Sequence, residues 1–205
     1  TVESYLTKSK IVQFAINPYV GCPHACKYCY ASFMKRFTGH SESWGDFIDI
    51  KRARHKINGS QITGKNVFMG TVTDCYNPYE VKYGITRSIL EQLVSVDCYL
   101  QIATKNKLIL RDLDLLKKMK HLSVALSVNT LDENFRRDMD RASTVRERLE
   151  TLRTLHENGI YTILFMSPIF IGVTDWKAII ETSRSFVSEY WFEDLNLRGG
   201  YKNDI

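Results

Sequence analysis

The sequence predicts an α/β fold on a parallel sheet, either open and doubly wound or curved into a barrel. Two observations support this prediction: apolar, β-branched segments alternate with segments of helical spacing, and polar residues follow the predicted strands where they end. Alternating strands and helices imply right-handed βαβ crossovers, and therefore parallel strands. The length of 205 residues and the 44% hydrophobic content favour a single domain, residues 1–205.

Continuous or alternating apolar runs predict six strands, at 11–16, 66–73, 98–104, 122–128, 161–166 and 191–197. Helical spacing predicts four helices between them, at 86–94, 110–119, 144–157 and 175–188. Several of these begin at Thr, Ser or Asp, and the third ends at Asn158-Gly159, as helices commonly do. Eight βα units take about 250 residues, so this chain has room for roughly six. Only eight residues follow the sixth strand, so we expect the native carboxyl-terminal part to be missing.

Polar or special residues follow each predicted strand. They are Gly21-Cys22, Thr73-Asp74, Thr104-Lys105, Ser127 with Asn129, Ser167-Pro168 and Arg198. In barrels and open α/β sheets the carboxyl ends of the strands carry the chemistry. We therefore expect these residues to gather round one site.

The sequence predicts no membrane span. The longest apolar run, 161–173, is interrupted by Ser167-Pro168 and is shorter than the roughly 20 residues that cross a bilayer. Residues 1–10 lack the apolar stretch of a signal peptide, so we expect a cytoplasmic location without membrane contact. The net charge is +5, and a basic cluster at 51–56 either attracts phosphate or forms a solvated helix face.

Three of the five cysteines, Cys22, Cys26 and Cys29, have the spacing C-x3-C-x2-C. In a reducing compartment such thiols bind metal more often than they form disulfides. Structural zinc needs a fourth ligand, and neither His24 nor His40 completes a familiar zinc spacing. Three thiolates suit a cubane iron–sulfur cluster with one iron left open for a ligand. An iron–sulfur site is therefore favoured, with zinc as the alternative.

This spacing, with the aromatic Tyr28 inside it, resembles the signature of the radical S-adenosylmethionine (radical SAM) superfamily. The resemblance implies an α/β fold of the partial (β/α)6 TIM-type barrel kind, with a cluster loop at 21–30. It implies an enzyme whose 4Fe–4S cluster binds S-adenosylmethionine (SAM) at its open iron. Reduction would cleave SAM to methionine and a 5′-deoxyadenosyl radical, which abstracts hydrogen from a substrate. A low-potential flavodoxin or ferredoxin would supply the electron.

A longer resemblance, over about residues 17–198, is to the group related to spore photoproduct lyase, often labelled DNA repair photolyases. It is carried by Asn-Pro-Tyr-x-Gly-Cys-x-His-x-Cys-x-Tyr-Cys-Tyr-Ala from residue 17 and by the segments 70–74, 103–105 and 110–114. Kinship of this kind does not fix the substrate.

The same resemblance implies which residues hold the charged end of SAM. Thr73 and Asp74 would contact the methionyl amino group, and Lys105 would pair with the carboxylate, both through charge-assisted hydrogen bonds. The alternative for Asp74 is a turn or helix cap before 76–78, and the alternative for Lys105 is an ordinary exposed lysine.

The resemblance also implies contacts to the rest of SAM. Ser127 and Asn129 would serve the ribose hydroxyls, and Tyr28 with Pro168 would border the adenine. Tyr28 and Tyr30 match two tyrosines of a proposed radical relay in the lyase, although Tyr30 could instead only pack around the cluster.

The sequence departs from the lyase at the hydrogen donor. The lyase has a cysteine three residues before the aspartate, and Thr71 occupies that position here. Cys75 follows Asp74 directly and either delivers hydrogen from a shifted position or is a buried, inert thiol. Cys98, at the start of the third strand, is expected in the core at the opposite end of the barrel.

Three functions remain open at this stage. The first is a radical SAM enzyme acting on nucleic acid, and the second is one acting on a peptide, cofactor or small metabolite. The third, from another class, is a non-catalytic iron–sulfur or zinc-binding module.

Overall fold

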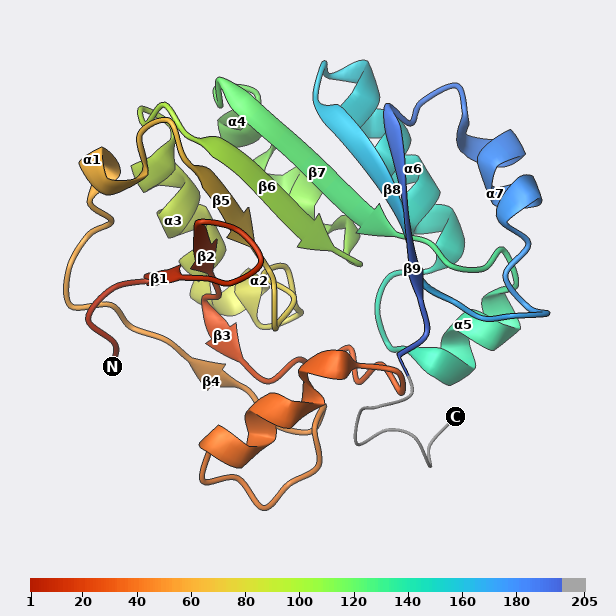
Figure 1. The fold of residues 1–205 in the computed structure, drawn as a ribbon, viewed down its shortest axis with the longest axis horizontal. Helices are drawn as coiled ribbons and strands as arrows, with labels where there is room; N and C mark the ends of the chain where they lie inside the picture. Colours follow the sequence, from red (N-terminus) through yellow and green to blue (C-terminus); the bar gives the residue numbers. More distant parts are fainter. Residues whose placement is uncertain (197–205) are drawn as a thin grey trace.

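The computed structural model describes residues 1–196, and its centre is a seven-stranded sheet (Figure 1). The strand order is β1-β2-β5-β6-β7-β8-β9, and β3 with β4 forms a separate pair. The strands are β1 (Leu6–Lys8), β2 (Phe14–Ile16), β3 (Tyr19–Val20), β4 (Asp49–Ile50), β5 (Asn66–Met69), β6 (Tyr99–Thr104), β7 (His121–Ser127), β8 (Tyr161–Ile169) and β9 (Glu189–Asp194).

Seven α-helices and two 3-10 segments connect the strands of the described chain. They are η1 (Tyr30–Phe37), α1 (Gly59–Ile62), α2 (Glu80–Tyr83), α3 (Ile85–Leu93), η2 (Lys107–Asp112), α4 (Leu113–Leu116), α5 (Glu133–Met139), α6 (Val145–Glu157) and α7 (Trp176–Ser183). In Figure 1, α3, α4 and α6 lie behind the sheet. Among the described residues, no helix is long and apolar enough to cross a membrane.

The strand order decides between the two predicted sheet architectures. From β2 to β9 each strand pairs in parallel with the next in the sheet, and the order never reverses. A doubly wound sheet needs such a reversal, because that is how helices reach both faces. The fold is therefore a partial barrel with β1 and β9 as its edges, which confirms the barrel prediction and excludes the doubly wound one.

The six predicted strands are all present, with shifted ends. The first begins at Phe14 because residues 9–13 form the turn from the antiparallel strand β1, which the sequence did not predict. The second ends at Met69, before Gly70 with its φ of 91°. The sixth begins at Glu189, and the predicted end at 197, like Arg198, lies outside the described residues.

The four predicted helices agree with the structure to different degrees. The helix at 144–157 is confirmed as α6: the Thr144 hydroxyl and the Glu147 carboxylate form a reciprocal capping box, and the chain turns at Gly159 with a φ of 78°. The helix predicted at 110–119 is instead the 3-10 segment η2 followed by the short α4. The helix predicted at 175–188 ends at Ser183, because the chain must return to pair as β9.

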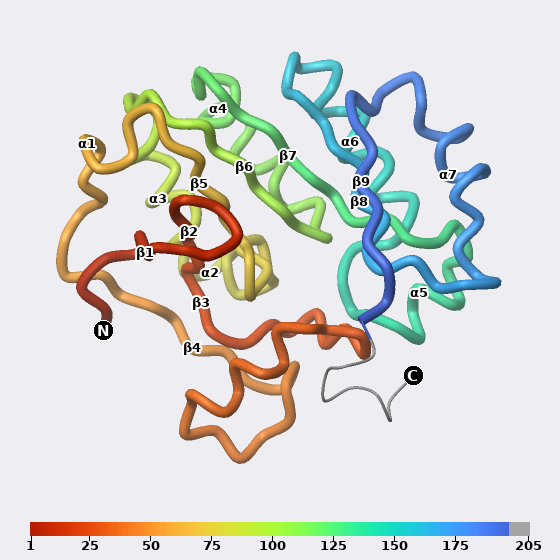
Figure 2. Tube along the Cα trace, viewed as in Figure 1, coloured from red at the N-terminus to blue at the C-terminus, as the bar shows by residue number. Residues whose placement is uncertain are grey.

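The carboxyl ends of the parallel strands point toward one edge of the molecule, the lower edge in Figure 1. The segment from β3 through η1 to β4 crosses beneath that edge, as the red and orange part of the tube in Figure 2 shows. The apolar core lies between the sheet and α3 and α6, with Ile102 and Val124 from the sheet against Ile89 and Leu152 from the helices. The core thus fixes the strand ends against which residues 21–48 are placed.

Candidate functional site

A cavity of about 410 Å³ lies where the strand ends meet the loop at 21–30. It is lined by residues from that loop, from the ends of β5, β6, β7 and β8, and from the end of β9, among them Cys22, His24, Cys26, Tyr28, Cys29, Tyr30, Thr71, Thr73, Asp74, Thr104, Lys105, Ser127, Phe165, Ser167, Pro168, Glu193 and Asp194. Most of the predicted site residues therefore gather at one place, as expected from their positions after parallel strands.

The three cysteines of the C-x3-C-x2-C motif all line this cavity. Cys22 is buried, whereas Cys26 and Cys29 are half-buried, and no disulfide joins them. The loop turns twice, with Ala25 N donating to Cys22 O and Cys29 N to Cys26 O. Ala25 has a φ of 47°, in the left-handed region that few non-glycine residues adopt. The loop backbone is thus turned so that all three thiols face one space.

Residues 39–48, which we call the cover segment, pack closely against this loop. A Cβ at Gly21 would lie 2.4 Å from Phe47 O, and a Cβ at Gly45 would lie 2.6 Å from Ala25 Cβ. Both glycines have positive φ, 86° and 108°, so any side chain there would be strained and would also clash. On the same segment, Trp44 Nε1 donates a hydrogen bond of 3.3 Å to Cys29 Sγ. The sequence did not predict the cover segment, because it has no regular periodicity.

The thiols suit an iron–sulfur cluster by their chemistry. Burial raises the pKa of all three, that of Cys26 to about 12, so the metal-free protein holds neutral thiols. Coordination to a metal deprotonates a thiol outright. Three thiolates are the donor set with which a cubane cluster is held on three of its irons, leaving the fourth open.

Asp74 is a buried hub that joins three parts of the site. Its Oδ1 accepts from Tyr76 N and Thr104 Oγ1, both at 2.8 Å, and its Oδ2 accepts from Lys105 N at 2.8 Å. His24 Nδ1 lies 3.2 Å from Oδ2, close but without the alignment of a hydrogen bond. Burial would raise the Asp74 pKa, but His24 and these donors outweigh it and hold the pKa below its usual value. The turn predicted as the alternative role of Asp74 is therefore present, at the cavity wall.

Lys105 and Tyr28 lie together on the cavity wall. Lys105 Nζ lies 5.5 Å from the centre of the Tyr28 ring, and the lysine forms no salt bridge with a described residue. Tyr28 is buried, stands edge-on to Phe170, and donates from its hydroxyl to Asp140 Oδ2 at 3.2 Å. Asp140 is itself held by Arg148 Nη2 at 2.5 Å. Lys105 thus lines the cavity without a salt bridge to a described residue, although its charge acts on nearby Asp140.

The residues predicted for the ribose and adenine divide between the cavity wall and the layer behind it. Ser127 and Pro168 line the cavity at the ends of β7 and β8. Asn129 is buried and does not line it, yet its Nδ2 has no hydrogen-bond partner. Thr73 lines the cavity, but its hydroxyl donates to Gly21 O at 2.7 Å and so ties the end of β5 to the cysteine loop.

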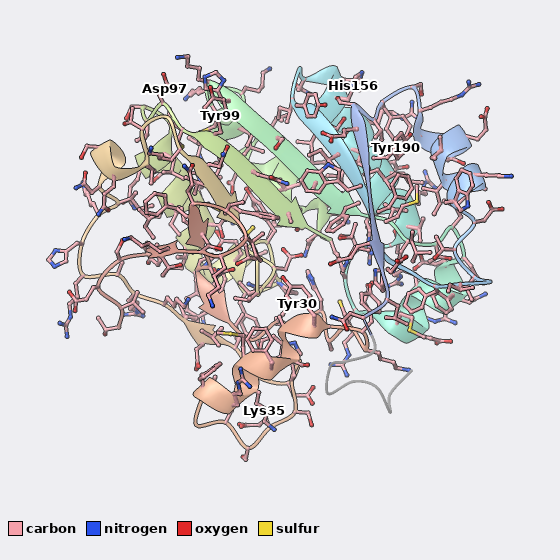
Figure 3. All side chains as sticks on the ribbon, viewed as in Figure 1. Tyr30, Lys35, Asp97, Tyr99, His156 and Tyr190 are labelled. Atoms are coloured by element: carbon pink, nitrogen blue, oxygen red, sulfur yellow. The ribbon has the colours of Figure 1, made fainter. Side chains whose placement is uncertain are left out.

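Tyr30 begins η1 and reaches toward the strand ends (Figure 3), where its hydroxyl donates to Thr71 O. Its pKa is raised to about 12 by burial and by nearby Cys29 and Glu193. Thr71, in the position of the lyase donor cysteine, lines the cavity, and its hydroxyl accepts from Asn17 Nδ2 at 2.8 Å. Tyr30 and Thr71 thus form one polar edge of the cavity.

The two remaining cysteines lie away from the cavity. Cys75 has no exposed surface, packs in the hydrophobic core and is not among the lining residues, and its role as a hydrogen donor stays a prediction. Cys98 is also in the core, as predicted, between Asp97 and Tyr99, which Figure 3 places at the opposite end of the sheet from Tyr30.

Sequence reasoning missed several residues of the site. The Asp140–Arg148 pair behind Tyr28 joins α5 and α6 to the cysteine loop across more than a hundred residues of chain, and no local pattern marks it. His24 lies inside the quoted motif and could have been singled out there. Glu193 reaches the cavity from β9 and accepts from Ser167 Oγ.

Two other predicted features lie outside the cavity. The basic cluster 51–56 lies outside the helices and strands, and Arg54 and His55 pair with Glu3 there. The segment 110–114 supplies Arg111 and Asp112 to a buried ion network. A second groove, of about 550 Å³ between α5, α6 and α7, contains no cysteine among its lining residues.

Comparison with known proteins agrees with the geometry. The family model described as the Radical SAM superfamily matches residues 16–182. The "Uncharacterized protein MJ0683" of Methanocaldococcus jannaschii is 38% identical over 194 residues, covering 94% of this chain and 74% of that protein. The "Uncharacterized protein ORF301" of Acidianus two-tailed virus is 33% identical over 170 residues, covering 77% of this chain and 56% of its own length.

Solved structures share the fold at low sequence identity. Spore photoproduct lyase complexed with dinucleoside spore photoproduct has a TM-score of 0.60 and 16% identity, covering 88% of this chain and 52% of that one. Streptococcus suis SuiB bound to S-adenosylmethionine has a TM-score of 0.60 and 14% identity, covering 91% of this chain and 41% of that one. This chain thus spans about half the length of these structures or less. On the sequence match over most of its length, the chain belongs to the radical SAM superfamily.

Proposed function

We propose that this chain is the core of a radical SAM enzyme that holds a 4Fe–4S cluster on Cys22, Cys26 and Cys29. The observation that carries the proposal is that three thiols from one loop line a single cavity together with Lys105 and the ends of five strands. Membership in the superfamily implies an enzyme that uses SAM and an iron–sulfur cluster. When bound, the reduced cluster supplies the electron that cleaves SAM, and the resulting 5′-deoxyadenosyl radical takes hydrogen from the substrate.

The chain's own residues would position SAM beside the cysteine loop. Lys105 lines the cavity, has no salt-bridge partner among the described residues and would pair with the methionyl carboxylate. Ser127 on the cavity wall and the unpartnered Asn129 amide behind it would serve the ribose hydroxyls. Tyr28 and Pro168 would border the adenine.

The amino group of SAM would be received near Thr73 and Asp74, and the geometry sharpens this part of the proposal. A carboxylate accepts at about four positions, and three of those on Asp74 already hold hydrogen bonds while the fourth faces His24. An ammonium group would therefore have to take the place of His24 or of one donor. Asp74 would act mainly by holding Thr104 and the Lys105 backbone in place.

The substrate is proposed at the level of class. Likeness to spore photoproduct lyase, solved with a dinucleoside spore photoproduct, supports a nucleic acid. The alternative, a peptide or small metabolite, is supported by likeness to SuiB bound to precursor peptide SuiA. It is also favoured by Glu193 and Asp194 at the cavity, since carboxylates repel phosphate. Binding to DNA or RNA that weakens steeply with salt would separate the two.

A low-potential flavodoxin or ferredoxin would provide the electron, and the protein would act in the cytoplasm. The 4Fe–4S type of cluster belongs to the same proposal. The remaining alternative, a non-catalytic iron–sulfur or zinc-binding module, predicts that SAM stays intact.

The test is anaerobic reconstitution with iron and sulfide, reduction with dithionite, and chromatography for 5′-deoxyadenosine. Wild-type protein with about four irons should form it, Cys26→Ala should not, and Cys98→Ala should behave as wild type because Cys98 lies at the far end of the sheet. Absence of 5′-deoxyadenosine from iron-loaded wild type would refute the enzyme, and its formation by Cys26→Ala would refute the cluster assignment.

A further inference from the structure

Trp44, on the cover segment, is oriented toward one of the three cluster cysteines. Its Nε1 donates to Cys29 Sγ at 3.3 Å, a normal length for a hydrogen bond to sulfur. The ring stands edge-on to Phe47, with ring centres 5.7 Å apart at 84°. Phe47 is buried and in turn stacks on His40, with ring centres 4.1 Å apart. The aromatic packing therefore holds the indole N–H toward the sulfur.

The close packing of the cover segment against the cysteine loop fixes the position of this contact. Gly21 and Gly45 allow the cover segment to lie against the cysteine loop at distances that no side chain would tolerate. Trp44 is half-buried, so its N–H is partly withdrawn from water. Among residues 1–196, Cys29 is the one motif cysteine whose sulfur accepts a hydrogen bond from another side chain.

We propose that Trp44 tunes the reduction potential of the cluster by hydrogen-bonding the Cys29 thiolate. This inference rests on the proposed function, because it needs a cluster on Cys22, Cys26 and Cys29. Reduction adds one electron to the cluster and makes the sulfur ligands more negative, without forming or breaking a bond. An N–H donor stabilises that added charge, and hydrogen bonds to the sulfurs are among the factors that set cluster potentials.

The consequence for the reaction is a balance between two demands. A less negative potential makes the cluster easier for its electron donor to reduce. It also leaves the reduced cluster with less driving force to transfer that electron to SAM. Trp44 would therefore act as a positioning and tuning residue, at one cysteine only, and without touching SAM.

The first test compares reconstituted wild type with Trp44→Phe by potentiometric titration, following the signal of the reduced cluster by electron paramagnetic resonance. Trp44→Phe keeps an aromatic ring against Phe47 but removes the N–H donor, so the midpoint potential should shift to a more negative value. The matched control is Trp176→Phe on α7, an exposed tryptophan that should leave the potential unchanged. Equal potentials in wild type and Trp44→Phe would overturn the proposal.

A second test uses the wild-type fold, in case Trp44→Phe does not retain a cluster. Protein containing tryptophan labelled with 15N at the indole nitrogen should show a 15N hyperfine coupling in the reduced cluster. Trp191→Phe protein should keep this coupling, because Trp191 Nε1 donates to Glu189 instead. A cluster without 15N coupling would overturn the role of Trp44 and leave the proposed function standing. Wild-type protein that binds no cluster would overturn both the proposed function and this inference.

Discussion

Two groups of buried carboxylates in the described chain differ in their surroundings: Asp74 lines the cavity, whereas Glu80 and Asp112 do not. Asp74 follows β5 and is bound by neutral donors, namely Tyr76 N, Thr104 Oγ1 and Lys105 N. Glu80 and Asp112 lie in α2 and η2, have no exposed surface and are bound by arginine side chains. Both groups come from, or lie next to, segments that resemble the lyase group. A shared motif therefore marks positions in the fold, and the cavity shows which of them can reach a ligand.

The arginine-bound group, which we call the Glu80–Asp112 network, is built for stability. Arg111 binds Glu80 and Asp112, each at 2.8 Å, and Arg87 joins Asp112 to Asp114 at 2.9 Å. It connects α2, α3 and η2 beneath the strand ends. Neither Glu80 nor Asp112 lines the cavity, so its loss should weaken the fold and spare the chemistry.

The largest expected effect is on stability, from Asp112→Asn. Breaking a buried ion pair by removing one partner costs about 3 kcal/mol at the low end of its range, which suits arginines that are partly exposed. SAM cleavage per folded molecule should stay at the wild-type level. The measurement is urea unfolding alongside the 5′-deoxyadenosine assay.

The matched control for this change is Asp114→Asn, which loses a bond to the same Arg87 at an exposed position. It should cost less than about 1 kcal/mol, as exposed pairs do. If both variants lost the same free energy of unfolding, the burial of Asp112 would make no difference to the strength of its ion pairs.

Asp74→Asn should show the opposite pattern. The amide removes the charge and one acceptor oxygen that hold Thr104 and the Lys105 backbone in place. We expect this to raise the free-energy barrier of SAM cleavage by about 2 kcal/mol, which slows cleavage roughly 30-fold. Thr104→Val, which removes one donor to Asp74, should reduce cleavage less than Asp74→Asn. Steady-state cleavage at equal iron content measures both. Wild-type rates in Asp74→Asn would remove the distinction between the two groups.

Asp140 combines features of both groups, because it pairs with Arg148 and also receives Tyr28. Burial would raise its pKa, but Arg148, Lys105 and the Ala142 N–H outweigh burial and hold the pKa below the usual 3.8. A lowered pKa in the folded state contributes stability above pH 3.8 that is lost as the pH falls through the folded value.

The stability difference between wild type and Asp140→Asn should therefore be constant from neutral pH down to about 5 and shrink below pH 3.8. Chemical unfolding at a series of pH values measures it. A difference that persists unchanged into strong acid would contradict the charged pair.

The smallest effect is expected from Cys75→Ala. Its thiol packs in the core beside the hub without reaching the cavity, so SAM cleavage and product formation should both remain at wild-type levels. Stability should fall by about 1 kcal/mol, as for loss of a small buried group. Chromatography of both products checks this, and loss of substrate product with intact SAM cleavage would restore Cys75 as a hydrogen donor.

Much of the fold was predictable from local patterns. The apolar runs located the six parallel strands, and the cysteine spacing located the loop that the structure turns toward the cavity. The short strands β1, β3 and β4 were missed because two or three residues are too few to show a period, and the cover segment was missed because it has no regular periodicity. The contacts that organise the site, such as Tyr28 with Asp140 and Asp74 with Thr104, join distant parts of the chain and leave no local signal.

The central claim is that SAM binds at an iron held by the cysteine loop, and this can be measured directly. The measurement is electron–nuclear double resonance on the reduced cluster with SAM labelled by 15N at the methionyl amino group and 13C at its carboxylate. We expect both nuclei to couple to the cluster in the wild type and in Cys98→Ala. A reduced cluster with bound SAM but no coupling to either nucleus would contradict the claim.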